Sequence, residues 1–395
     1  MKLFRHLPGL VAGVALSACA TTDYAARAAG ERPSDLSSTE ASLWYQMDEA
    51  EDKLAVSGRV VDDETLNAFV ADMTCRLTDE YCSQLRSYIV REPVFNAFMA
   101  PNGMMVVNTG LLLRAENESE LAFVLSHEFV HFQENHSYER YGSIKNANVY
   151  GTILATVLAG VGGGSFASLG YMMTYSGAAA FGREQETEAD LKGMDRLADA
   201  GYNPRSGSRL WSNLLDELNA TSIRTKKKKA VKNQADIYDS HPVISARITA
   251  IDSRAIGMPD VETHDAAYRD MIRPFLKDWL DDEIVKRDYG ATLQLISRLS
   301  AQGTDAGILR AAEGRTLMLR GETGDTEAAR AAFEAAIAMP DVPADAHRTL
   351  ADIYRADGLN DAACAEYAAY LAAEPGAADR SLIQSIISTL GGKTT

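Results

Sequence analysis

The sequence predicts a mainly α-helical protein with a small β-sheet, in which an α+β domain precedes an all-helical domain. Three patterns support this prediction. An apolar segment at helical spacing after about residue 118 carries imidazole and carboxylate side chains, two short β-type runs precede it, and roughly the last hundred residues are alanine-rich and repetitive. The chain has 395 residues, which is enough for two such domains.

Residues 1–18 have the pattern of an export signal. A short basic start precedes an apolar stretch too short to remain as a spanning helix, and the segment leads into Leu-Ser-Ala-Cys at residues 16–19. The pattern resembles a bacterial lipoprotein signal, which implies that Cys19 is lipidated; an ordinary secretory signal is the alternative. Because residue 20 is Ala and not Asp, the resemblance favours the outer membrane. Residues 19–40 are expected to form a flexible tether.

The chain is acidic, with a formal net charge of −16, which argues against nucleic acid as a partner. The four lysines at residues 226–229 are predicted to lie in a solvated loop, and contact with anionic lipid is the alternative. An exported chain can form disulfides, and a turn predicted between Cys75 and Cys82 would allow them to bond. Cys364 lies in an alanine-rich helical pattern and is expected to be a buried free thiol.

The first domain is predicted to occupy residues 41–255. Its pattern is helical at 43–77 and strand-like at 87–91 and 104–108, with the turn signal Pro-Asn-Gly just before the second strand. Residues 104–107 are interpreted as an edge strand on which an extended substrate could add. One helix is predicted from about residue 119, and another from about 182 to 200, where Gly-Tyr-Asn-Pro ends it.

Residues 146–182 contain no charged side chain. Three glycines at 162–164 divide the stretch into two apolar blocks, whereas a membrane-spanning helix needs about 20 apolar residues without such a break. Two helices or a flap packed near the site is therefore the favoured interpretation. A hairpin that dips into the membrane is the alternative.

The strongest chemical motif is His-Glu-Phe-Val-His at residues 127–131. Residues four apart on a helix are rotated by about 40° from one another, so His127 and His131 point the same way and can bind one zinc ion per chain. Glu128 lies beside them, where it can act as general base on a water molecule. His136 would lie on the opposite face of a continuing helix, and it is expected to be structural.

Zinc needs a third protein ligand and an open position for water. Glu186 and Asp190 are the best candidates, because they lie four residues apart on one predicted helix face. One carboxylate could bind the metal while the other accepts the free ring N–H of a histidine ligand. Their spacing does not decide which carboxylate has which role, and Glu188 remains a further candidate for the ligand.

Three groups of residues together resemble the gluzincin metallopeptidases of family forty-eight, which include HtpX and the CaaX prenyl proteases. They are the His-Glu-x-x-His motif, Glu-Thr-Glu-Ala-Asp at 186–190, and Ser-His-Pro at 240–242 followed by Arg247. The resemblance covers roughly residues 43–255. It implies a zincin-type domain that hydrolyses peptide bonds.

The resemblance also implies a role for individual residues. Glu186 would be the third zinc ligand, and Asp190 would support His127 from behind. His241 and Arg247 would stabilise the oxyanion that forms on the substrate carbonyl. His241 could also occupy the open zinc position before a substrate arrives, which would keep the enzyme inactive.

The C-terminal region repeats with a period of 34 residues. Three positions of one unit recur in the next: Ala329, Phe333 and Ala336 correspond to Ala363, Tyr367 and Tyr370. This period and these small and aromatic residues resemble the tetratricopeptide repeat, a helix–turn–helix unit. The repeats are predicted at residues 304–395, after a helical connector or degenerate repeat at 256–303. A plain helical bundle is the alternative.

With its export signal and repeat tail, the whole chain is similar to periplasmic members of this peptidase family. The resemblance implies a lipid-anchored enzyme at the periplasmic face of the cell envelope, expected at the outer membrane, that degrades misfolded or stalled envelope and outer-membrane proteins. The repeats would recruit these substrates or the outer-membrane assembly machinery. The alternative is a chaperone or assembly scaffold that acts through its repeats, with minor or regulated proteolysis.

Overall fold

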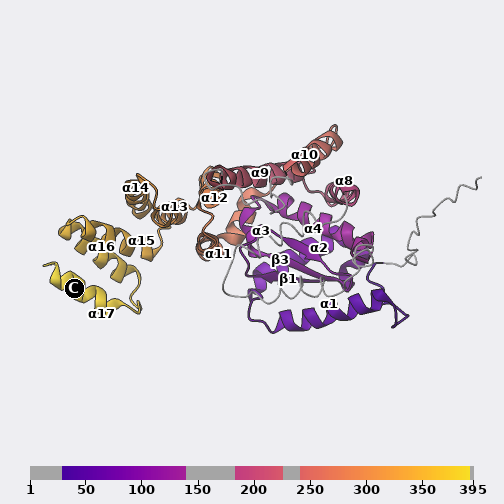
Figure 1. Cartoon of the computed structure of the whole chain (residues 1–395), viewed down its shortest axis with the longest axis horizontal. Coiled ribbons are helices and arrows are strands. Elements are labelled where there is room, and N and C mark those ends of the chain that lie inside the picture. Colours follow the sequence, from indigo (N-terminus) through magenta and orange to yellow (C-terminus); the bar gives the residue numbers. More distant parts are fainter. Residues whose placement is uncertain (1–28, 139–182, 226–240, 392–395) are drawn as a thin grey trace, which may run out of the picture.

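The structure, a computed structural model, describes residues 29–138, 183–225 and 241–391. It consists mainly of helices around one three-stranded mixed sheet, followed by a C-terminal region of paired helices, so the predicted fold class is confirmed (Figure 1). Cys19, the uncharged stretch 146–182 and the lysines at 226–229 lie outside the described residues. Among the helices that are described, none is long and apolar enough to cross a membrane.

The sheet has the strand order β1-β3-β2. β1 (Arg86–Val90) pairs with β3 (Met104–Asn108) in parallel, and β2 (Ala97–Met99) pairs with β3 in antiparallel fashion. The two predicted strands are therefore present to within one residue, and β2 arises in the segment expected to link them. The interpretation of residues 104–107 as an edge strand is wrong, because β3 has a partner on each side and all of its residues are buried.

The turn signal before β3 explains this difference. The Gly103 N–H donates to the Ala100 carbonyl and the Ala100 N–H donates to the Met104 carbonyl, so the chain folds β2 back along β3. Gly103 has a φ of +88°, and a Cβ atom there would lie 2.4 Å from the Gln84 carbonyl oxygen. Glycine is therefore required at this position, and the hairpin moves the sheet edge from β3 to β2.

Helices cover both faces of the sheet (Figure 1). Alternate residues of β3 point to opposite faces, so Met104 and Val106 pack in one apolar cluster with side chains of α1 (Thr39–Ala55). Met105 and Val107 belong to the main core on the other face, together with side chains of α2 and α4.

α2 spans Glu64–Thr78 and α4 spans Glu118–Gln133. The pattern predicted as helical over 43–77 is thus two helices, separated by a loop in which Gly58 has a φ of +67°. A short 3-10 helix, η1 (Asp79–Gln84), follows α2, and Cys75 and Cys82 form a disulfide across this junction. Cys364 is a free thiol and is only partly buried.

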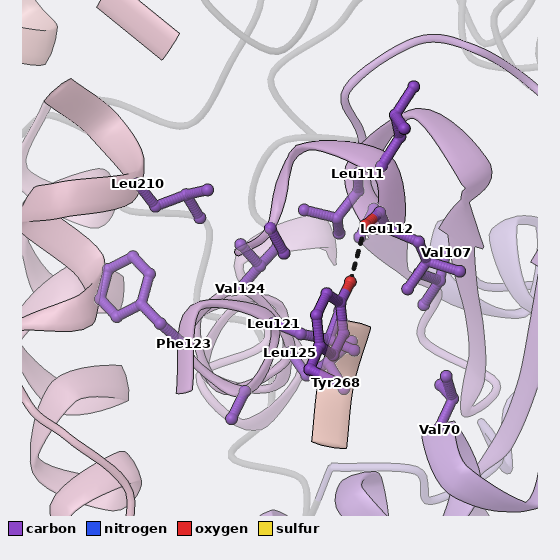
Figure 2. Close-up of a cluster of buried hydrophobic side chains, with 14 of the residues drawn as sticks. Val70, Val107, Leu111, Leu112, Leu121, Phe123, Val124, Leu125, Leu210 and Tyr268 are labelled. Carbon is purple, nitrogen blue, oxygen red and sulfur yellow. Dashed lines mark hydrogen bonds between the residues drawn. The ribbon is translucent and has the colours of Figure 1, made fainter. Parts of the chain in front are cut away.

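The remaining helices of the first region are α3 (Thr109–Arg114), α8 (Arg183–Asp199), α9 (Ser206–Thr225) and α10 (His241–Arg254). They are followed by α11 (Asp265–Val285) and α12 (Tyr289–Ser300), which contribute to the same core as α2 and α4. Figure 2 shows Tyr268 of α11 among the side chains of this core, where its hydroxyl donates to the Leu112 carbonyl at 2.7 Å. Residues 256–303, expected as a connector or degenerate repeat, therefore pack as part of the first region's interior.

A buried ion network also joins α11 and α12 to the preceding helices. The Arg114 guanidinium at the end of α3 donates to Glu217 of α9 at 2.7 Å and to Glu283 of α11 at 2.8 Å. Arg298 of α12 donates to Glu217 at 2.7 Å and to Glu116 at 2.8 Å. Four helices are held at one point by these charges.

The C-terminal region contains α13 (Ala306–Arg320), α14 (Asp325–Ile337), α15 (Ala344–Ala356), α16 (Asn360–Ala373) and α17 (Arg380–Thr389). α13 packs on α14, α15 packs on α16, and α17 covers the end (Figure 1). The repeating aromatic positions are Phe333 and Tyr367, and both are fully buried. This pairing agrees with a helix–turn–helix repeat, and the tetratricopeptide assignment itself stays a prediction.

Candidate active site

Helix α4 carries His127 and His131 in the interior of the first region. The helix begins where the Asn117 side chain accepts from the Glu120 N–H, and nearly all of its residues are buried. The two imidazoles face one another, and their Nε2 atoms are 3.1 Å apart. The helical spacing in the sequence therefore produces a pair of convergent nitrogen ligands.

Helix α8 packs against α4 and supplies the carboxylates. The helices approach closely at Gly193, where a Cβ atom would lie 3.1 Å from the His127 backbone nitrogen. Glu186 then lies 3.7 Å from the Nε2 atom of His127 and 3.7 Å from that of His131. The ligand atoms of these three residues all lie within 4.8 Å of one another.

This group has the chemistry and dimensions of a zinc site. Ligand atoms placed tetrahedrally about 2.1 Å from zinc are about 3.4 Å apart. The measured separations of 3.1 Å and 3.7 Å lie on either side of this value. Two imidazoles and one carboxylate are a donor set that zinc takes in catalytic sites, with a fourth position left for water or substrate. The residues therefore fit the metal.

Asp190 lies one helical turn beyond Glu186 and contacts His127 from behind, with Oδ1 at 3.0 Å from Nδ1. An ionised Asp190 can only accept, so His127 holds its proton on Nδ1 and presents the Nε2 lone pair to Glu186 and His131. Burial opposes ionisation of Asp190, but the charge of Arg247 and hydrogen bonds from Arg247 and His127 lower its pKa to about 2. Asp190 thus lies behind His127, on the side of the ring away from Glu186.

Arg247 of α10 binds both carboxylates. Its guanidinium donates to Asp190 at 2.6 Å and 2.7 Å, and another nitrogen lies 3.1 Å from the Glu186 carboxylate. It also stacks on the Trp211 ring, with Cζ 4.0 Å from the centroid. These contacts of Arg247 hold the acidic side chains in place. The position of Arg247 in the sequence, six residues after His241, did not indicate this function.

His241 is the first residue of α10. Its side chain lies outside the part of the chain whose side chains are described. Its expected roles at the oxyanion and at the zinc therefore stay predictions, as does the oxyanion role of Arg247.

Glu128 follows His127 directly, on the same turn of α4. Burial raises the pKa of its carboxyl to about 7, while the neighbouring charges of His127 and Glu186 act in opposite directions. A carboxylate with a pKa near neutrality accepts a proton at physiological pH more readily than an ordinary glutamate and can also return it. The side chain is thus suited to general acid–base chemistry.

His136 does not lie on the opposite face of a continuing helix, as its spacing suggested, although the expectation that it is not a zinc ligand agrees with its position outside the group of three ligand residues. Helix α4 ends at Gln133, and Asn135 takes a left-handed conformation with a φ of +59°. The chain therefore turns back, and the Nδ1 atom of His136 lies 2.9 Å from Nδ1 of His131. The signal was present in the sequence, because Asn tolerates the left-handed conformation that ends many helices. Glu188 approaches the other nitrogen of His136 at 3.5 Å instead of the metal position.

Comparison with known proteins agrees with this geometry. The profile described as Peptidase family M48 matches residues 62–255. The Mitochondrial metalloendopeptidase OMA1 of Arabidopsis thaliana is 32% identical over 172 residues, which are 41% of this chain and 34% of that protein. The Beta-barrel assembly-enhancing protease of Escherichia coli (strain K12) is 23% identical over 212 residues, or 51% of this chain and 42% of that protein.

These matches confirm the predicted resemblance to metallopeptidase family forty-eight, and they show distant similarity to the beta-barrel assembly-enhancing protease and to the mitochondrial enzyme. The chain spans less than half the length of the curated relatives named above. The matched family region contains α4 and α8, which carry the histidines and carboxylates of the site, and α10, which carries Arg247.

Proposed function

Residues 62–255 belong to peptidase family M48, and from this membership we propose that the protein is a zinc-dependent endopeptidase. The observation that carries the proposal is the convergence of His127, His131 and Glu186 beside Glu128. The first three residues provide a ligand set that leaves one zinc position open, and Glu128 provides a base with a pKa near neutrality.

Each residue of the site has a different function in the proposed hydrolysis of a peptide bond. His127, His131 and Glu186 would hold one zinc ion, which when bound lowers the pKa of water and polarises a carbonyl oxygen. Glu128 removes a proton from the attacking water and then passes it to the leaving amine. Asp190 keeps His127 in the tautomer that offers Nε2, and Arg247 holds Asp190 and Glu186 in place through ion pairs.

A substrate strand would bind at β2. Within the residues that the structure describes, β2 pairs only with β3, and it packs on α4, the helix that carries the zinc ligands. An extended peptide added at the outer edge of β2 would run alongside this helix. The proposal moves the expected substrate strand from β3 to β2.

The cellular setting is proposed from the sequence and the relatives. The lipoprotein-like signal supports a lipid anchor at Cys19, and the similarity to the Beta-barrel assembly-enhancing protease of Escherichia coli supports a function in the envelope. Misfolded or stalled envelope proteins are the proposed substrates. The paired helices α13–α17 are the proposed surface for recruiting them or the outer-membrane assembly machinery.

The substitution Glu128→Gln tests the catalytic proposal. The amide keeps the size of the side chain but cannot accept the proton, so cleavage of an unfolded protein such as casein should fall at least about 100-fold. Zinc content, measured on the purified protein, should stay at one ion per chain. Unchanged cleavage would refute the mechanism, and a cellular phenotype unaffected by the substitution would favour the scaffold function.

A further inference from the structure

The second zinc-binding histidine, His131, also has a partner behind it, and this inference rests on the zinc site proposed above. His131 and His136 face each other through their Nδ1 atoms at 2.9 Å. The far side of His136 faces Glu188, with Nε2 and Oε2 3.5 Å apart. Both imidazoles are buried, with 2% and 3% of their surfaces exposed.

The directions of the hydrogen bonds follow from Glu188. An ionised carboxylate can only accept, so the Nε2 atom of His136 carries a proton. In the neutral ring the Nδ1 atom of His136 is then an acceptor, and the proton between the two rings belongs to Nδ1 of His131. His131 therefore presents a lone pair on Nε2, the atom that faces Glu186 and His127.

Glu188 is itself held in place. Lys192 lies 2.7 Å from Glu188 and 2.8 Å from Glu134, which is the residue after the end of α4. These ion pairs hold the Glu188 carboxylate on the far side of His136, where it can accept from the Nε2 atom.

We propose that His136 and Glu188 are positioning residues that fix the tautomer and orientation of His131. They correspond to Asp190, which contacts His127 directly. Each of the three acidic residues between 186 and 190 then has a separate task. Glu186 faces the metal position, Glu188 acts through His136, and Asp190 acts on His127.

Two variants of nearly equal size test the role of His136. In His136→Asn, the side-chain oxygen takes roughly the place of Nδ1 and can still accept from His131. In His136→Leu, the packing volume is retained but the acceptor is lost. Zinc affinity is measured by competition with a chromophoric chelator, and the unfolding midpoint of each metal-free protein is measured in urea.

His136→Leu should weaken zinc binding by about 10- to 100-fold, the usual effect of removing a partner of a histidine ligand. His136→Asn should retain most of the affinity, and the two metal-free variants should unfold at similar urea concentrations. Glu188→Ala should cause a smaller loss, because Glu188 is 39% exposed and water can replace its carboxylate.

Wild-type affinity in His136→Leu would overturn the proposal. Equal losses in the Asn and Leu variants, accompanied by equal loss of metal-free stability, would also overturn it and make His136 a packing residue only. If the wild-type protein bound no zinc, the proposed function itself would fail, which is a separate outcome.

Discussion

Arg247 and its acidic partners set the electrostatics of the site at the scale of single residues. The guanidinium lies within 3.1 Å of both Glu186 and Asp190, and all three groups are largely removed from water. Burial alone would favour a neutral Asp190, so the pairing with Arg247 keeps this carboxylate available as an acceptor, and the same guanidinium orients Glu186. This role differs from the oxyanion stabilisation implied by family resemblance. The effects of a substitution on zinc affinity and on kcat distinguish the two roles.

Arg247→Lys should weaken zinc binding by about 10-fold or more, because a single ammonium group cannot bind Asp190 through two nitrogens and also reach Glu186. The zinc dissociation constant and kcat should be measured together. A fall in kcat with unchanged zinc affinity would indicate that Arg247 acts on the oxyanion alone. Arg310→Lys, the same substitution at an exposed position of α13, is the control.

The packing of α8 on α4 matters most at the scale of elements. Gly193 lets the two helices approach, and this approach brings Glu186 and Asp190 to the histidines. A glycine inside a helix normally costs about 0.5–1 kcal/mol relative to alanine. Its presence here is explained by the contact with the His127 backbone.

Gly193→Ala should therefore destabilise the protein by about 1–3 kcal/mol, although helix propensity alone would predict a gain of about 1 kcal/mol. The added methyl group would lie 3.1 Å from the His127 nitrogen and push the helices apart. Urea unfolding of the metal-free protein and zinc titration are the measurements. An increased free energy of unfolding would show that α4 and α8 can move apart to accommodate the methyl group at no cost in stability.

The edge strand β2 leads to a second prediction at this scale. The Asn108 N–H donates to the Asn96 carbonyl, and the Ala100 N–H donates to the Met104 carbonyl. In an antiparallel pair, residues that bond to the partner strand alternate with residues that do not. Met99 lies next to Ala100 and is therefore a residue of the second kind, so its N–H points away from β3.

Met99→Pro removes this N–H without removing a bond to β3, and it should raise KM for an unfolded substrate several-fold and shift the cleavage sites. Met99→Leu, which keeps the N–H, is the control. Fragment patterns analysed by mass spectrometry report the cleavage sites. Unchanged patterns and KM in the proline variant would exclude β2 as the substrate edge.

At the scale of the whole molecule, α11 and α12 complete the interior of the first region. Tyr268 bonds to the Leu112 carbonyl, and Glu283 binds Arg114, so this segment is tied to the peptidase elements by apolar burial and by charge. The matched family region ends at residue 255, before these helices. The same core includes Leu309 and Ala312 of α13, and Asp305 binds the buried Arg269 of α11, so we propose that the folding unit extends beyond the family region through α13, to about residue 321.

Truncation tests this boundary. A chain ending after Gly321 should remain folded, bind zinc and cleave casein, although it loses α14–α17. A chain ending after Met258 would expose the core that α11 covers and leave Arg114 buried without Glu283, which costs about 3–5 kcal/mol for the charge alone. It should unfold or aggregate. Circular dichroism and zinc content distinguish the two, and a stable shorter chain would refute the boundary.

Local patterns in the sequence determined the helices, two strands and the chemistry of α4. Helical spacing alone makes His127 and His131 neighbours, and the fold class follows from periodicities over a few turns. The third strand was missed, because β2 is only three residues long and depends on pairing with β3. The edge position was assigned to the wrong strand for the same reason.

The histidine contacts of the acidic residues 186–190 depend on the tertiary structure and could not be predicted from their spacing. Spacing left Glu186, Glu188 and Asp190 as alternatives. In the structure Glu186 lies near the Nε2 atoms of His127 and His131, Asp190 contacts Nδ1 of His127, and Glu188 approaches His136. His136 joined the site because the chain reverses after Gln133. A sequence determines which residues share a face of one helix, whereas contacts between elements depend on packing that local spacing does not encode.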